Sequence, residues 1–320
     1  MVTYNLEDFN SLQLQYDRVF EKKKQLDNAR PLPTIALQKL KESLFMEWTY
    51  NSNAIEGNTL TLNETKLVLQ DGMTVKGKSL REHFEVTNHH DAIDYIETLV
   101  KPTYTLRERD LLDIHQLVMQ RIDREFAGRI RNAGVRIMGA NFVPPNAMRV
   151  PDFVRDLILW VNENPDKLSP LWLATVFHHR FVWIHPFFDG NGRTVRLAMN
   201  LLLMRKGFPP AIILKNDRKK YYEALNQANN GKYYKLALLM LQALERSLDI
   251  YLTTIPGAEE NYVPISQLVE EPQMPYGQEY VSLLARQGKI DAYKEGRTWY
   301  TTETAVKDYI KKRQRNRVLA

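Results

Sequence analysis

The sequence contains no cysteine among its 320 residues. This absence excludes disulfide bridges, thiolate zinc sites and a cysteine nucleophile, and it fits the reducing cytoplasm, where we expect this chain to work. Long apolar runs are also lacking, since no stretch of ~18 residues is free of charge. The first residues, MVTYNLEDFN, have neither the basic start nor the apolar core of a signal peptide. We therefore expect no membrane span or secretion, and any chemistry must use histidine, carboxylate, arginine or hydroxyl groups.

The composition that is present is typical of an ordered globular protein. Hydrophobic residues make up 44% and charged residues 26% of the chain, with 14 glycines and 15 prolines. A chain of this length accommodates about two domains. The net charge of +6 allows binding of nucleic acid or of anionic small molecules without choosing between them. The positions of the basic residues therefore matter more than their number.

Helical spacing of apolar residues dominates from Asn5 to about Leu252 and predicts a mainly α fold. The exception is 128–151, where β-branched residues alternate with polar ones and two adjacent prolines interrupt any helix. We predict a β-hairpin flap in this segment. Helices over 152–162 and 170–184 are predicted to follow it.

The helical periodicity is lost at TTIPGAEEN, residues 253–261, which has the composition of an exposed linker. The residues after it indicate two short helices, a two-stranded wing around Glu295-Gly296 and a last helix, which is the pattern of a small winged helix-turn-helix domain. We therefore predict an N-terminal helical region, a core and a C-terminal module, with bounds 1–100, 101–252 and 253–320.

The most informative segment is 185–196, which reads HPFFDGNGRTVR. Gly190 and Gly192 let backbone N–H groups approach a ligand closely, and the apolar run after Arg193 begins a helix, so the loop is predicted to form an anion-binding helix N-terminus. Arg193 and Arg196 lie three residues apart on one helical face, where an anion between them relieves their repulsion and matches their forked donors. The pattern indicates a polyphosphate ligand.

Two further residues of the segment are suited to hold a metal and to move a proton. Asp189, just before the glycines, can hold Mg²⁺, which binds a carboxylate plus phosphate oxygens and keeps several waters. His185, with an ordinary pKa of about 6.5, can take a proton from an attacking hydroxyl at neutral pH. From these residues alone we predict nucleotidyl or phosphoryl transfer.

The whole segment resembles the signature of Fic-domain proteins, HxFx(D/E)GNGRxxR, and it matches at every position. The resemblance implies a helical Fic-type core with a β-hairpin flap. It also implies a protein adenylyltransferase, which moves AMP from ATP onto a Tyr, Thr or Ser hydroxyl of a protein, including its own chain.

The resemblance also implies a role for each residue of the motif. His185 would be the general base, and Asp189 would bind Mg²⁺ at the α- and β-phosphates. Asn191 and the glycine backbone would form the anion hole, and the two arginines would contact the β- and γ-phosphates. The implied nucleotide-binding residues of the motif are Gly190, Asn191, Gly192, Arg193 and Arg196.

Two other segments resemble family elements that bind the nucleoside and the target. KKYYEALNQANNGKYY is similar to the nucleoside-binding helix, which would place Tyr222 and Asn229 near the adenosine; a core tyrosine and a helix-end asparagine are the alternative reading. Family members dock the target on the flap, so 136–141 would add a strand to it, whereas a flap that only covers the core needs no ligand. The flap residues predicted to act are Met138, Gly139, Ala140 and Asn141.

Near the N-terminus, SNAIEGNTL places Ser52, Glu56 and Gly57 between apolar helical stretches. Alone, this is the pattern of a helix end with a solvated glutamate. Beside the catalytic segment it resembles the inhibitory (S/T)xxxE(G/N) element of the Fic class with an N-terminal inhibitory helix. There the glutamate pairs with the second motif arginine, here Arg196, and takes the space of the γ-phosphate. We expect auto-inhibition, released by a change of oligomeric state or by self-modification.

The remaining histidines form no zinc-binding spacing such as HExxH. We expect them to be packed or surface side chains rather than ligands. They are His83, His89, His90, His115, His178 and His179.

The charge of the C-terminal module bears on its partner. Residues 257–320 hold ten Lys or Arg against nine Asp or Glu, and the predicted recognition helix 278–287 offers only Arg286 as a basic residue. A DNA reader normally carries a basic face, so DNA binding is not favoured over target docking or dimerisation. The expected partners are ATP, Mg²⁺, a protein with an accessible hydroxyl and a second copy of the chain, without a membrane.

Two other functions stay open at this point. In some Fic relatives the inhibitory glutamate helps to position a water that removes AMP from a modified protein, so Glu56 would then be catalytic. The other alternative is a DNA-binding regulator in which the core only senses ATP. The sequence does not choose the direction of the AMP transfer.

Overall fold

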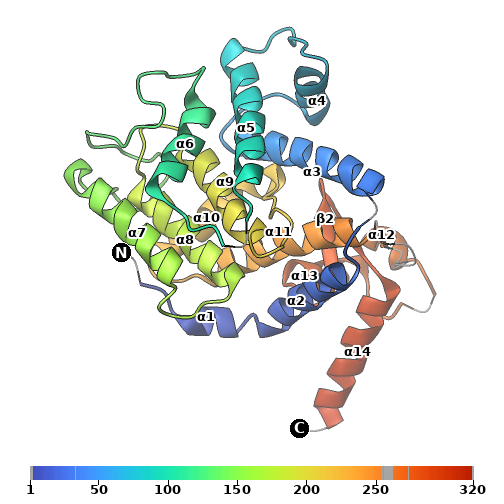
Figure 1. Cartoon of the computed structure of the whole chain (residues 1–320). Coiled ribbons are helices and arrows are strands. Elements are labelled where there is room, and N and C mark those ends of the chain that lie inside the picture. The colour runs from blue at the N-terminus through green and yellow to red at the C-terminus, as the bar shows by residue number, and fades with distance from the viewer. Residues whose placement is uncertain are drawn as a thin grey trace.

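The computed structural model describes residues 3–32, 34–101, 103–253, 255, 262–272 and 274–318. Within these ranges helices predominate, and a three-stranded antiparallel sheet lies in the C-terminal part (Figure 1), so the mainly α fold class is confirmed. The elements are α1 (Leu6–Asn10), α2 (Gln13–Asn28), α3 (Thr34–Ile55), α4 (Leu62–Gln70), α5 (Leu80–Thr98), α6 (Glu108–Met119), η1 (Ala147–Arg149), α7 (Val150–Glu163), α8 (Pro170–Ile184), α9 (Asn191–Met204), η2 (Lys215–Asp217), α10 (Arg218–Ala228), α11 (Tyr234–Leu252), β1 (Val263–Pro264), α12 (Ile265–Leu268), α13 (Gln278–Arg286), β2 (Ala292–Glu295), β3 (Thr298–Thr301) and α14 (Glu303–Val318).

Helices α8 and α9 lie at the centre of the large hydrophobic core. They pack against each other, and α8 also packs against α7 and α11. Side chains around the circumference of both helices are buried, including Phe177, Phe181 and Leu197 with no exposed surface. Helices packed on all sides hold the loop between them in a fixed position. None of the helices in the described ranges is both long and apolar enough to cross a membrane.

Two residues in the left-handed backbone conformation shape the connection from α8 to α9. α8 begins at a Ser169 N-cap and ends where His185 adopts a φ of 50°. α9 begins after Gly190, whose φ of 72° is a conformation that glycine adopts readily. The predicted catalytic segment is therefore a short, sharply turned loop held between two buried helices.

The β-hairpin predicted for 128–151 is not formed, because no strand is present among these residues. The segment is a loop followed by η1 and the start of α7. Two of its carbonyls bind a side chain: the guanidinium of Arg131 donates to the carbonyls of Ala133 (2.9 Å) and Pro145 (2.6 Å). Pro144 and Pro145 also have no N–H to give to a ladder. The predicted flap is therefore a loop that the side chain of Arg131 holds in place.

The C-terminal elements have a hydrophobic core of their own, which includes Ile265, Val281 and Val306. β2 and β3 pair antiparallel on either side of Gly296, as predicted for the wing, and β1 pairs with the other edge of β3. The large core draws residues from both 1–100 and 101–252. Of the predicted linker 253–261, residues 254 and 256–261 lie outside the described residues. The division into three regions stays a prediction.

A buried ionic cluster joins the C-terminal elements to α2 and α11. Nζ of Lys22 lies 2.5 Å from Oδ1 of Asp249, 2.5 Å from Oδ1 of Asp291 and 3.2 Å from Oε1 of Glu245. Arg18, one turn earlier on α2, pairs with Glu245 and donates to the carbonyl of Gly288 at 3.1 Å. The basic groups of α2 thus neutralise carboxylates from both sides of this contact.

Replacing Lys22 by alanine is expected to lower the free energy of unfolding by about 3–5 kcal/mol, because removing one partner of a buried ion pair leaves uncompensated charge. Chemical denaturation of the two proteins measures this difference. Lys24→Ala, an exposed position on the same helix, is the matched control and should change stability by no more than about 0.5 kcal/mol. Equal effects of the two substitutions would contradict the role given to the cluster.

Candidate active site

A cavity of about 480 Å³ lies between the α8–α9 loop, α10, the flap and the turn after α3. Its volume is within the range of small-molecule sites, which is roughly 300–1,000 Å³. Four separate parts of the chain meet in it, and they include most of the predicted site. The predicted residues that line the cavity are Glu56, Met138, Gly139, Ala140, His185, Asn191, Gly192, Arg196, Tyr222 and Asn229.

The first turn of α9 and Arg196 form an anion site that holds the carboxylate of Glu56. Among the described residues, no side-chain hydrogen bond caps this helix N-terminus at Gly190. A β-carbon at Gly192 would lie only 2.1 Å from Oε1 of Glu56, so the carboxylate rests directly on the loop backbone. Arg196 Nη2 donates to Oε1 of Glu56 at 2.7 Å, and its Nε donates to Oγ of Ser52 at 3.0 Å. An internal carboxylate thus occupies the place predicted for phosphate.

The turn after α3 is what presents Glu56 to the cavity. α3 ends at Ile55, and Gly57 has a φ of 106°, which favours glycine. Nε of Arg218 on α10 donates to the carbonyl of Ile55 at 2.6 Å. The position of Glu56 is therefore tied to α10, which also lines the cavity with Tyr222.

Arg193, like Arg196, is buried beside the α8–α9 loop. Its side chain is almost fully buried, and within the described residues its Nε and Nη1 make no hydrogen bond. Its ion pairs with Asp189 and Glu85 are long, at 3.5 Å each. Buried donors without hydrogen bonds are costly. These groups fit an anionic ligand that supplies the missing acceptors.

Asp189 carries the carboxylate predicted to hold a metal. Burial alone would raise its pKa, but Arg193, the Gly190 N–H and Arg81 outweigh burial and hold the pKa below its usual value. The ionised side chain is half exposed, and Oδ2 accepts from Nη2 of Arg81 at 2.6 Å. One accessible carboxylate beside the groups predicted to bind phosphate fits Mg²⁺, which completes its shell with phosphate oxygens and water.

His185 lies at the end of α8 with its ring in the cavity wall. Arg131, fully buried, donates from Nε to the His185 carbonyl at 2.7 Å and so fixes the backbone that carries the ring. Burial lowers the pKa of His185 to about 4. In the described part of the chain its Nδ1 has no hydrogen-bond partner. The ring is therefore neutral at pH 7, which is the form in which a histidine accepts a proton.

Three asparagines join the flap to the end of α10. Nδ2 of Asn229 donates to Oδ1 of Asn141 at 2.8 Å, and Nδ2 of Asn226 donates to the carbonyl of Gly139 at 3.2 Å. Oδ1 of Asn229 accepts from Nε2 of His179 at 2.9 Å. Asn229 is thus both the helix-end residue of α10 and part of the cavity lining. The side-chain amide of Asn191, by contrast, accepts from the N–H of Phe187 and donates to its carbonyl.

The structure adds site residues that the sequence did not reveal. Besides Arg131 and Asn226, these include His115, which is buried as expected but also bonds to the Asp189 carbonyl at 3.0 Å and stacks on Phe187. Arg81 and Glu85 on α5 contact Asp189 and Arg193. In the sequence these two show only the spacing of an ordinary helical ion pair. Their contacts with the loop join positions about a hundred residues apart, which no local pattern marks.

Together, these contacts define a mainly helical fold with a cavity in which Arg196 and the first turn of α9 hold a carboxylate of the same chain. The chain belongs to the Fic/DOC family, and the sequence model of that family matches residues 105–203. Fic-1 from C. elegans has a solved structure that is 31% identical, with a TM-score of 0.69, over 77% of this chain and 74% of that one. A Fic domain containing signaling protein from Bacteroides thetaiotaomicron is 26% identical, with a TM-score of 0.67, over 77% of this chain and 99% of that one.

Curated relatives are similar over a large part of the chain. The protein adenylyltransferase Fic of Nematostella vectensis is 37% identical over 240 residues, which cover 74% of this chain and 56% of the relative. The protein of the same name from Aedes aegypti is 34% identical over 87% of this chain and 55% of the relative. The chain therefore spans about half the length of these curated relatives.

Proposed function

We propose that this chain is a protein adenylyltransferase whose basal activity is kept low by Glu56. Two relatives that are similar to most of this chain are named protein adenylyltransferases. The observation that carries the proposal is the cavity itself, in which a neutral buried histidine faces an uncapped helix N-terminus and Arg196. This combination suits transfer from a nucleoside triphosphate to a hydroxyl group.

In the proposed reaction a protein hydroxyl attacks the α-phosphorus of ATP. A bond forms between the hydroxyl oxygen and phosphorus, the bond to the β-phosphate oxygen breaks, and diphosphate leaves. His185 takes the hydroxyl proton, while the α9 N-terminus and Arg196 hold the polyphosphate in place. Bound Mg²⁺, held by Asp189, would supply neutralising charge for the diphosphate.

Glu56 opposes this reaction by occupying the anion site from within. Its carboxylate lies on the loop at Gly192 and pairs with Arg196, so a triphosphate cannot use that guanidinium while the pair is intact. A nucleotide that binds beside the pair has one phosphate displaced and a misaligned α-phosphorus, and misplacement of this kind is costly to transfer. Low basal activity follows.

Label position in ATP tests the reaction class directly. The Glu56→Gly protein is incubated with Mg²⁺, a cell extract and ATP labelled in either the α- or the γ-phosphate, and protein-bound label is followed. Adenylyl transfer gives label only from the α position. Label from the γ position in excess of that given by the extract alone would mean phosphoryl transfer by this chain, and no added label with either ATP, despite measured nucleotide binding, would overturn the proposed function.

The pH dependence follows from the environment of His185. Since burial lowers its pKa to about 4, the ring stays neutral down to about one unit above that value and protonates only as the pH falls through it. We expect kcat/KM of the Glu56→Gly protein to be nearly level on the acidic side down to about pH 5 and to fall below it. A pH–rate profile measures this, and an acidic midpoint near the ordinary histidine value of about 6.5 would contradict the assignment.

The reverse task, removal of AMP from a modified protein, has one observation in its favour. Glu56 and His185 line the same cavity, and the charge of Glu56 acts to raise the pKa of His185, so the two groups could position one water between them. The test uses a protein that already carries AMP and follows its release by the wild type and by Glu56→Gln. Release that depends on Glu56 would assign the carboxylate to this reaction.

We also propose that the C-terminal elements form a winged helix module that serves in docking rather than DNA reading. The order α12, α13, β2 and β3 supports the first part. The C-terminal end of α13 contacts α11 and α2. Nε2 of Gln242 donates to the Arg286 carbonyl at 3.2 Å, and Nε2 of Gln15 donates to the Gln287 carbonyl at 3.2 Å. A recognition helix held in this way, with Arg286 its only basic residue, is poorly suited to a DNA groove.

A further inference from the structure

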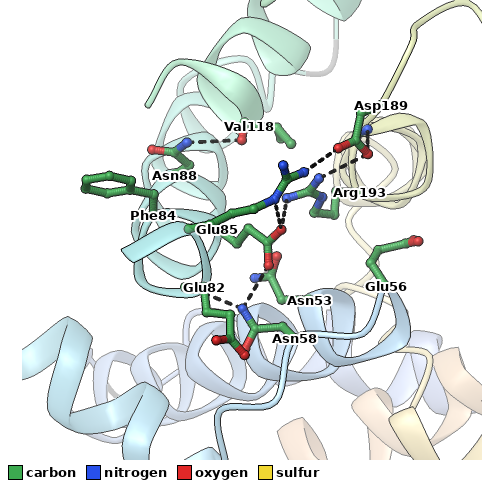
Figure 2. Close-up of polar contacts among 12 residues, drawn as sticks. Asn53, Glu56, Asn58, Glu82, Phe84, Glu85, Asn88, Val118, Asp189 and Arg193 are labelled. Atoms are coloured by element: carbon green, nitrogen blue, oxygen red, sulfur yellow. Dashed lines mark hydrogen bonds and ion pairs between the residues drawn. The ribbon is translucent and has the colours of Figure 1, made fainter. Parts of the chain in front are cut away.

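Two residues of α5 complete a closed ring of four charges at the edge of the site. Arg81 Nη2 lies 2.6 Å from Asp189 Oδ2, and Arg81 Nε lies 3.4 Å from Glu85 Oε1. Arg193 contacts both carboxylates, at 3.5 Å from Asp189 Oδ1 and 3.5 Å from Glu85 Oε1. In Figure 2, dashed lines join Glu85 to Arg193 and Arg193 to Asp189. Two guanidiniums and two carboxylates thus alternate around the ring.

Each α5 residue sits on the group that a ligand of the proposed reaction would use. Arg81 is a cation on the oxygen of Asp189 that a divalent metal would take, since Oδ1 already accepts from the Gly190 N–H at 2.6 Å. Glu85 is an anion on Arg193, whose unsatisfied donors fit a phosphate. A helix far away in the sequence therefore neutralises both halves of the metal and phosphate site.

We propose that Arg81 and Glu85 form an internal substitute for the metal–nucleotide pair, so that a divalent cation bound with a nucleoside triphosphate has to open this ring. The inference rests on the proposed function. It adds a second closure of the site, meaning an internal ion pair that occupies a group needed by the ligand, to the closure that Glu56 makes at Arg196. It gives Arg81 a defined role, which is to compete with the divalent cation for Asp189.

The two closures share one turn of the chain. Glu56 pairs with Arg196, and Asn58, two residues later, donates from Nδ2 to Oε2 of Glu85 at 3.0 Å and to the carbonyl of Glu82 at 3.0 Å. Figure 2 shows Asn58 between the end of α3 and the side chains of Glu82 and Glu85. Both motif arginines are thus held by carboxylates whose positions depend on residues 56–58.

The exposure of the ring indicates which side opens first. The side chains of Arg81 and Asp189 are 56% and 51% exposed, whereas those of Arg193 and Glu85 are 3% and 12% exposed. Exposed ion pairs are weak, so a metal can displace Arg81 readily. The inner pair is shielded from water and holds Arg193 until phosphate replaces the carboxylate.

Nucleotide binding with and without metal tests the proposal on the intact protein. Isothermal titration gives the Kd of an ATP analogue with a methylene group between its α- and β-phosphates, in excess Mg²⁺ and in EDTA. For Arg81→Gln, the ratio of the metal-free Kd to the Mg²⁺ Kd is expected to rise about threefold to fivefold over wild type, because an exposed competitor has been removed. Arg81→Lys should return the ratio toward wild type, and Glu85→Gln should tighten binding in both conditions.

The matched control is Arg155→Gln, which removes an arginine from an exposed ion pair with Asp152 whose side chains are 62% and 54% exposed. It changes net charge equally and should leave the ratio unchanged. An Arg81→Gln ratio equal to wild type, or weaker binding in Mg²⁺ with native circular dichroism, overturns the competition. If neither wild type nor Glu56→Gly binds the analogue in Mg²⁺, the proposed function fails instead, so the two failures are distinguishable.

Discussion

Replacing Glu56 by glycine is expected to raise the initial rate of AMP transfer about 10- to 100-fold over wild type, the range that follows from removing one charge-assisted hydrogen bond that competes with substrate. The physical reason is that Arg196, held at 2.7 Å by this carboxylate, becomes available to the triphosphate. The space above Gly192 opens as well, since Oε1 no longer lies on the loop. Transfer from α-labelled ATP to protein measures the rate.

Two further variants separate loss of the ion pair from loosening of the helix. Glu56→Gln keeps the shape of the side chain but not its charge, so an intermediate rate is expected. Glu42→Gly makes the same change at an exposed position of α3 that bonds only to Gln38 among the described contacts, and it should transfer at the wild-type rate. An equal rise in Glu42→Gly would show that helix loosening, and not release of Arg196, raises activity.

Replacing His185 by alanine in the Glu56→Gly protein is expected to lower transfer by about 10²- to 10⁴-fold, the usual contribution of a general base. Nucleotide affinity should change little, because the α9 N-terminus and Arg196 remain and Arg131 still binds the backbone carbonyl of residue 185. Rates and analogue binding are measured on the same preparations. His90→Ala, a histidine outside the cavity lining, is the matched control. Full transfer by the double variant would remove His185 from the mechanism.

The predictable part of the site is the part that is contiguous in sequence. From His185 to Arg196, spacing alone places a base, a carboxylate, two glycines and two arginines on one loop and the first turns of a helix. The structure has this arrangement because α8 and α9 are buried on all sides and their junction is sharply turned. The contact of Glu56 with Arg196 was also predicted, although 140 residues separate the two, because the segment around Glu56 resembles a family element once the catalytic segment is present.

The residues that escaped prediction act through long-range contacts. Arg81 and Glu85 show the spacing of a solvated helical pair, and nothing local indicates that their partners are Asp189 and Arg193. Arg131 lies in an alternating segment that predicts strands. Its buried guanidinium instead donates to the carbonyls of Ala133 and Pro145 and so holds the segment as a loop, through contacts that the local alternation does not reveal.

Two sets of internal ion pairs occupy the charged groups of the site. Glu56 fills the anion position at Arg196, and Arg81 and Glu85 of α5 neutralise Asp189 and Arg193. Because residues 56–58 take part in both, a single movement of this turn would release both motif arginines. The Arg218 contact with Ile55 further ties this turn to the wall that would hold the nucleoside.

The most direct test of the central claim is the intact mass of proteins after incubation with ATP and Mg²⁺. Wild type, Glu56→Gly and Glu56→Gly/His185→Ala are compared, each alone and with an extract that supplies targets. A mass increase of one adenylyl group on protein, strongest in Glu56→Gly and absent from the double variant, is the predicted result. A phosphate-sized increase, or no increase in Glu56→Gly while it binds nucleotide, would contradict an adenylyltransferase held closed by Glu56.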